Sequence, residues 1–559
     1  MVRSNEDNEQ GWRTPNRGGL ILLDEAGERQ LRISPASAFQ RPRLKQNVAP
    51  FAEAPPLAKA LYVTPKPPIQ LHDCLAISDW KGLRENLEEL QTRNDAFDFH
   101  CSFAEENEDQ ETPLHTAAWK SPPALTLQML ATIPPPQRKK IILRKDYAGN
   151  TVLHLCCANV DARVEFTVIK NVLLLAPEAL DMQNDGGDTP LHLLVCSPGF
   201  HKSFNFTVEN AAEEAITSLL SLVEEQGTRP NNLGLTLLHC AIAHGAHERV
   251  LVQLLRIVPQ AASVPNVRGM LPLHFAAAFG GTPWTFVHQL IEVYPQGLLA
   301  PSEDGDTPLH SLVVNAEKQL NEAGLLDRNT TKIAELLLAT PHGQRSAILV
   351  PNAENLAPLH CCAIFDAPPQ LTRILMESDH AIAASAMATQ SGWTALSLAC
   401  ASMERSTANV EALTTQTACK TFDDNDRTPL MVALENSSSP TRAIKFLVSA
   451  CPRSVLLATQ TGAYLPVHLA LMNHAKESIV KILVKANKAT LEVTDDAGNT
   501  GKYYWSRVSL DGVTHHARVS LNTLSSAATV SQRSTLPASK ELRFPSSNTY
   551  CESARMCAR

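Results

Sequence analysis

A single tetrapeptide, Thr-Pro-Leu-His, recurs along most of this chain of 559 residues, either intact or slightly altered. Its histidine falls at eight positions: His115, His154, His192, His239, His274, His310, His360 and His468. From His115 to His360 the copies are 39, 38, 47, 35, 36 and 50 residues apart. Self-similarity at such a period predicts a stack of small units, each packed on its neighbours, in place of one globular core.

The residues of one copy predict its local structure. In the stretch from Gly186 to His192 the glycines allow a turn with positive φ, Thr189 is a good N-cap, and Pro190 suits the first helical position. Small residues follow the histidine, and a second apolar segment such as 250–257 has helical periodicity. Each unit is therefore expected to be turn, helix, helix and loop. Degenerate copies at 394–397 and 428–431 fill the gap before His468.

The pattern resembles the ankyrin repeat family, whose T-P-L-H-x-A signature matches best at 112–117, 189–193, 271–276 and 307–311. The resemblance implies an all-α ankyrin-repeat solenoid of about ten to eleven helix-turn-helix repeats. Two features depart from the family: the units exceed its length of about 33 residues, and several second helices are followed by a proline (Pro177, Pro259, Pro295 and Pro452) that should end them. Elongated units of this kind resemble those of ankyrin proteins from algae and water moulds.

Three segments are predicted. Residues 1–67 are expected to be a disordered N-terminal tail, and 68–500 the repeat array, with a degenerate capping repeat near 68–100. Residues 501–559 are Ser-rich and lack the Pro-Leu-His that was due, so they are expected to be a disordered tail. An alternative is a gene-model artefact, because Gly501-Lys502-Tyr503 can be encoded by GGTAAATAC, which contains a splice-donor-like GTAA; transcripts without this stretch would support it.

Composition and charge exclude several classes. The formal net charge is −8, and with +2 in residues 1–60 and +5 in residues 500–559 the array carries −15, which argues against nucleic acid as a partner. No apolar run of about 18 residues suggests an integral membrane segment. The chain is expected to be intracellular and cytoplasmic, with the nucleus as the alternative, and monomeric. Its thirteen cysteines are expected to be reduced, because many occupy small-residue positions of the repeat.

No catalytic, metal or cofactor site is predicted. Pairs such as His154 with Cys156 and His360 with Cys361 are generated by the repeat itself, whereas a zinc site needs four convergent ligands. No phosphate-binding glycine loop of the G-x-x-x-x-G-K-S/T type occurs. The flanks are also too short for a catalytic domain, which needs on the order of 100 residues. The chain is therefore predicted not to be an enzyme.

The residue four positions before each signature histidine is expected to carry the function. In ankyrin proteins this hairpin position faces solvent and contacts the target, and here five of these residues are large and apolar: Leu235, Met270, Leu356, Trp393 and Tyr464. The chain is therefore predicted to be a scaffold or adaptor that binds other proteins through its hairpin tips and concave helix face. Two alternatives are a targeting subunit of an enzyme complex and a membrane-surface tether. The same side chains could instead pack on the neighbouring hairpin.

Overall fold

The computed structural model describes residues 71–93, 102–103, 105–120, 122–159, 165–197, 227–320, 324–339, 346–402, 407–435 and 439–508. The expectations for 1–67, and for 509–559 of the C-terminal tail, lie outside these residues. Within them the chain is all-α: no strand forms, and only three isolated β-bridges occur. The chain divides into two compact units, one ending at Val267 and one beginning at Arg268.

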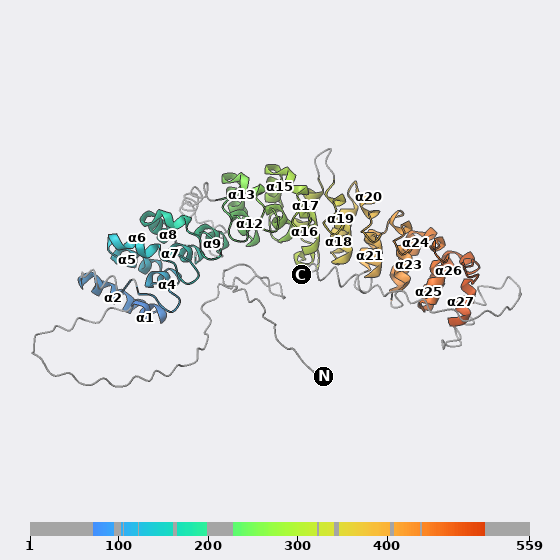
Figure 1. Ribbon diagram of the computed structural model, residues 1–559, viewed down its shortest axis with the longest axis horizontal. Coiled ribbons are helices and arrows are strands. Elements are labelled where there is room, and N and C mark those ends of the chain that lie inside the picture. The colour runs from blue at the N-terminus through green and yellow to red at the C-terminus, as the bar shows by residue number, and fades with distance from the viewer. Residues whose placement is uncertain are drawn as a thin grey trace, which may run out of the picture. The chain divides into compact units, whose positions relative to one another are not determined.

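In the first unit, short inner helices alternate with outer helices along the chain (Figure 1). The inner helices are α1 (Leu71–Ala76), α4 (Pro113–Lys120), α7 (Val152–Ala158), α9 (Pro190–Cys196) and α12 (Leu237–Ala243). The outer helices are α2 (Trp80–Arg93), α5 (Pro123–Thr132), α8 (Glu165–Leu175) and α13 (Glu248–Ile257), and α6 (Pro135–Ile142) is an addition before α7. Each inner helix packs on the next inner helix, and α2, α5 and α8 pack in the same order.

The second unit repeats this plan (Figure 1). Its inner helices are α14 (Pro272–Ala278), α16 (Pro308–Asn315), α18 (Pro358–Ile364), α21 (Ala395–Ala401), α23 (Pro429–Glu435), α25 (Pro466–Met472) and α27 (Gly501–Val508). Its outer helices are α15 (Trp284–Val293), α17 (Arg328–Leu338), α19 (Pro369–Met376), α22 (Ala408–Leu413), α24 (Thr441–Ala450) and α26 (Glu477–Ala486), and α20 (Ala381–Ser385) is an addition after α19. Inner helices pack on inner helices, and outer on outer, in chain order.

The signature predicts where the inner helices begin. Thr189 and Thr307 are N-caps in extended conformation, and the proline after each is the first helical residue. The degenerate copies behave alike, because α21 begins after Thr394 and α23 begins at Pro429. Buried faces of the helices are leucine, isoleucine, valine, alanine and cysteine, so each unit is held together by apolar packing between successive pairs.

The prolines after the outer helices do end them, as predicted. The residue before each proline leaves helical geometry, for example Val258 at φ −127° and ψ 69°. The chain then continues as a 3₁₀ turn, and this turn helps to explain the extra length of the repeats. The 3₁₀ helices are η1 (Pro177–Asp181), η2 (Pro259–Ser263), η3 (Pro295–Leu299), η4 (Ala316–Gln319), η5 (Ala347–Leu349), η6 (Ala418–Lys420), η7 (Pro452–Leu456) and η8 (Lys488–Leu491).

One boundary needs correction. The predicted tail begins at residue 501, but residues 501–508 form α27, which packs on α25. The hydroxyl of Tyr504 donates a 2.6 Å hydrogen bond to the buried carboxylate of Asp495 in the preceding turn. The repeat therefore continues past residue 500 even though the Pro-Leu-His motif is lost.

Hairpin turns of successive repeats are joined by backbone hydrogen bonds. In the second unit the N–H of Glu303 donates to the carbonyl of Arg268 (2.8 Å), and the N–H of Ala353 donates to that of Asp304 (3.1 Å). The residue five before the signature histidine has positive φ and is usually glycine. A Cβ added to Gly305 would lie 2.5 Å from the backbone nitrogen of Ala353, so the next hairpin leaves no room for one.

This close approach can be tested with two matched glycines. Gly305 and Gly498 occupy the same turn position at φ +77° and +76°, but none of the described residues has an atom within 4 Å of a Cβ at Gly498. We expect Gly498→Ala to cost only the strain of positive φ, about 1 kcal/mol, and Gly305→Ala to cost at least about 2 kcal/mol because the neighbouring hairpin must also move. Urea unfolding followed by circular dichroism measures both, and equal midpoints would contradict the steric explanation.

Candidate functional site: the corner between hairpins and inner helices

The repeated histidines are structural. Thr307 and His310 form a capping box at the start of α16. The Thr307 N–H donates to Nδ1 of His310 (3.2 Å), and the Thr307 hydroxyl lies 2.9 Å from the same nitrogen. Since an N–H can only donate, Nδ1 is unprotonated, and Nε2–H donates to the carbonyl of Leu356 in the next repeat (2.9 Å). His154 and His192 bond in the same way to the carbonyls of Asp188 and Leu235. Each imidazole thus caps its own helix and ties it to the following hairpin.

Burial keeps these imidazoles neutral. The box histidines are all at most 1% exposed, and burial lowers the pKa of His154 and of His192 to about 4. With both ring nitrogens occupied, such an imidazole has no free nitrogen for a metal or a substrate proton. Across the described residues, no group of three or more His, Cys, Asp or Glu side chains is arranged to hold a metal ion. His468, in α25, is an exception: its buried Nε2 lies near the backbone of Val493 but makes no hydrogen bond of normal geometry with the described residues.

The thiols of the repeats are also unsuited to nucleophilic chemistry. Cys157, Cys361 and Cys362 are buried, and burial raises the pKa of the Cys362 thiol to about 12. Burial raises the pKa values of Cys157 and Cys361 as well. A reactive cysteine needs the opposite shift, because the thiolate is the nucleophile. These cysteines act as small apolar packing residues.

We call the residue four positions before each signature histidine, or before the residue that replaces it, the corner residue. It lies at the corner between the hairpin turn and the inner helix. Two contacts define the geometry. The corner residue Arg427 binds Glu435 at the end of its own inner helix, at 2.7 Å, and the corner residue Glu111 accepts a hydrogen bond from the Thr116 hydroxyl on α4. Corner side chains of this kind lie over their own inner helix, whereas others, such as Asp306, accept a hydrogen bond from an asparagine of the next hairpin.

This placement corrects the expectation that the five predicted contact residues face solvent. Leu235 is only 6% exposed and Trp393 only 8% exposed. Met270, Leu356 and Tyr464 are half-buried. Corner side chains contact their own inner helix or the next hairpin, and these contacts are the physical reason for the burial. A role of the five in binding a partner stays a prediction.

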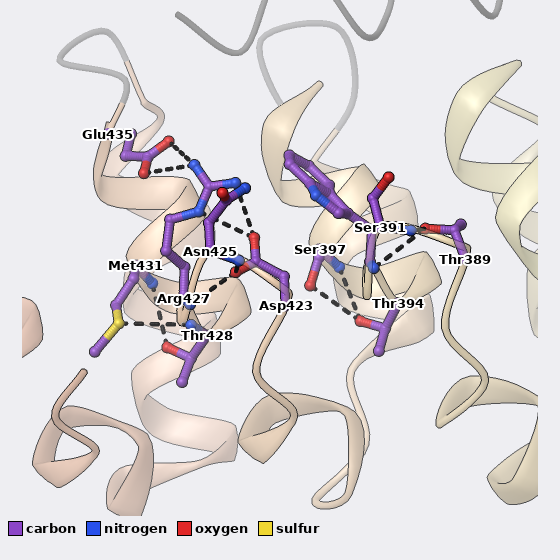
Figure 2. Close-up of polar contacts among 11 residues, drawn as sticks. Thr389, Ser391, Thr394, Ser397, Asp423, Asn425, Arg427, Thr428, Met431 and Glu435 are labelled. Carbon is purple, nitrogen blue, oxygen red and sulfur yellow. Dashed lines mark hydrogen bonds and ion pairs between the residues drawn. The ribbon is translucent and has the colours of Figure 1, made fainter. Parts of the chain in front are cut away.

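A charged cluster of Arg427, Asp423 and Glu435, shown in Figure 2, lies against Trp393. The guanidinium carbon of Arg427 lies 5.2 Å from the centroid of the indole ring, while the guanidinium group binds Asp423 at 2.8 Å and Glu435 at 2.7 Å. These ion pairs raise the pKa of Arg427 even though burial opposes the shift. The cluster joins two successive repeats that lack the histidine, where Ser397 and Met431 stand in its place.

The large apolar side chains that do project from the hairpin turns are different ones. In the first unit Tyr147 is 59% exposed, Leu233 is 41% exposed and Val267 is 60% exposed. They lie six or seven residues before the signature position, at the centre of the turn. The glycine five before the histidine marks that centre, so counting from this glycine would have found them.

Comparison with known proteins adds little to this description. No family model matches the chain, and no curated protein matches it. Among solved structures, the chain is similar to the ankyrin repeat domain of Bcl-3, described as a unique member of the IκB protein family. The identity is 18%, the match covers 48% of this chain and 98% of that domain, and the TM-score is 0.32. Within the described residues, no helix combines the length and apolarity that crossing a bilayer requires.

Proposed function

We propose that this chain is an ankyrin repeat protein and that it acts as a non-catalytic scaffold or adaptor, binding other proteins along its corner residues and the adjoining faces of the inner helices. The single observation that carries the proposal is the position of the corner residues. In the second unit, the corner residues Met270, Leu356 and Tyr464 are apolar and half-buried, and they lie at the hairpin side of the inner helices.

Further apolar side chains extend the same surface. Val314 and Ile364 are half-buried at the carboxyl ends of their inner helices, at the helix position that Glu435 occupies in α23, and Met472 is 38% exposed there on α25. In the repeats of α18 and α25, an apolar inner-helix end and an apolar corner residue thus lie together, and with Met270 and Val314 they form a partly exposed apolar strip that charged corner residues interrupt. Partner surfaces commonly combine such anchors with a polar rim. The buried cysteines and most of the signature histidines, by contrast, are used in packing and helix capping.

The test compares two triple variants of the full chain. In one, Met270, Leu356 and Tyr464 are each changed to Ser; in the control, Val293, Ile382 and Leu456, which are exposed and lie outside the corners, are changed to Ser. We expect the corner variant to recover fewer co-purifying proteins from the source cells by quantitative mass spectrometry, and the control to match the parent chain. Equal recovery by all three proteins, with unchanged helical circular dichroism, would refute the proposal.

A further inference from the structure

Charge in the second unit is strongly segregated. Six hairpin turns, at 302–306, 352–356, 389–393, 423–427, 460–464 and 495–499, contain nine Asp or Glu residues and one basic residue, Arg427. The turn at 266–270, which crosses the start of this unit and holds Arg268, is counted with the remainder. The remainder of 268–508 contains thirteen acidic and seventeen basic residues. The hairpin edge is therefore acidic while the rest of the same unit is basic. A uniformly solvated surface would not separate the two signs in this way.

Part of this acidity has a structural role. Asp423 accepts hydrogen bonds from the N–H groups of Asn425 and Arg427, and Asp495 accepts one from the N–H of Asn499, so these carboxylates hold their own turns. Asp496 accepts from the N–H of Gly462 in the preceding hairpin. Asp304 is paired with Arg268. Hydrogen bonds within and between turns, together with one ion pair, explain why acidic residues occupy these positions.

Three exposed carboxylates have no such role. No hydrogen bond or ion pair between described residues is formed by the carboxylates of Glu303, Glu354 and Asp424, and all three residues are exposed. Glu303 and Glu354 lie on successive hairpins that the bond from Ala353 to Asp304 holds side by side. They therefore add negative charge to the edge without stabilising the fold.

The acidic edge borders the apolar strip described above. Glu354 and the half-buried Leu356 belong to one turn, and the corner residue Met270 directly precedes Leu271, the N-cap of α14. A segment lying along the inner helices would meet apolar side chains on one side and carboxylates on the other. We infer that the protein partner of this unit is a segment in which Lys or Arg side chains alternate with apolar ones. This inference rests on the proposed function and names the chemistry of its ligand.

The test uses a defined probe, a fluorescein-labelled amphipathic peptide of leucine and lysine, with a leucine and glutamate peptide as comparison. We expect fluorescence anisotropy to show binding of the lysine peptide, weakened between about 0.05 M and about 0.3 M salt by screening. The variant Glu303→Lys with Glu354→Lys should weaken it about tenfold. Its control, Glu377→Lys with Asp379→Lys, makes the same change of net charge at exposed residues away from the hairpins and should weaken it less than about twofold.

Two results would overturn the inference: equal weakening by the two charge-reversed variants, which would indicate non-specific attraction, or equally tight binding of the glutamate peptide. The corner variant with three Ser substitutions separates this failure from failure of the proposed function. If that variant loses cellular partners while Glu303→Lys with Glu354→Lys keeps them, the binding surface stands and the basic character of the partner is wrong.

Discussion

Acidification from pH 7.5 to pH 5 should lower the free energy of unfolding markedly. Burial lowers the pKa of His154 and His192 to about 4, so between pH 6.5 and pH 4 the unfolded chain binds more protons than the folded one. Stability from these imidazoles is complete above pH 6.5 and is lost as the pH falls. At pH 5 the loss is about 2 kcal/mol for each. Burial also lowers the pKa values of His115, His274, His310, His360 and His468.

Two buried carboxyl groups act in the opposite direction. Burial raises the pKa of Asp188 to about 6 and also raises that of Asp146. As the pH falls, the folded chain therefore binds a proton at Asp188 at a higher pH than the unfolded chain does. This raises the free energy of unfolding at pH 5 by about 1.4 kcal/mol. Because seven histidines oppose two carboxyl groups, we expect a net loss.

Urea titrations followed by circular dichroism at pH 7.5, 6.5 and 5 measure this effect. The interval from pH 7.5 to pH 8.5 lies above the histidine window and serves as the control, with little expected change. A urea midpoint that is the same at pH 7.5 and pH 5 would show that the imidazoles are not held neutral by the fold.

Removing one imidazole, by His310→Ala, should cost about 3 kcal/mol. The substitution leaves the Thr307 N–H and the Leu356 carbonyl without their partner, and His310 is fully buried. The matched control is His288→Ala on α15, where the side chain is half-exposed and contacts Glu292 at 3.6 Å; its cost should stay below about 0.5 kcal/mol. Urea midpoints measure both costs. Similar shifts for the two variants would mean that the hydrogen bonds of His310 contribute little to the stability of the fold.

The starts of the inner helices follow from local chemistry and could be predicted. Thr189, Pro190 and the preceding glycines act within a few residues of one another, so their pattern is visible in the sequence. The stops at Pro259 and Pro295 are local for the same reason.

The corner surface could not be predicted in the same way. Whether a side chain before the helix points out or lies over it depends on how the hairpin folds back, as the contact of Arg427 with Glu435 shows.

The helix at 501–508 was missed for a different reason. Gly501 and Tyr503 stand where proline and histidine were expected, while the turn residues Gly498 and Thr500 are kept. Turn and cap residues were the better guide there, since they set the backbone path.

The direction of the imidazole bonds has a consequence for shortened chains. Nε2 of each bonded histidine in the second unit reaches forward, from His274 to Asp306, from His310 to Leu356 and from His360 to Met387. Deleting repeats from the carboxyl side therefore removes the acceptor of the last remaining cap histidine, whereas deleting them from the amino side leaves every remaining imidazole with its acceptor. Truncations of equal length should be tolerated unequally, and mechanical unravelling should proceed more readily from the carboxyl end.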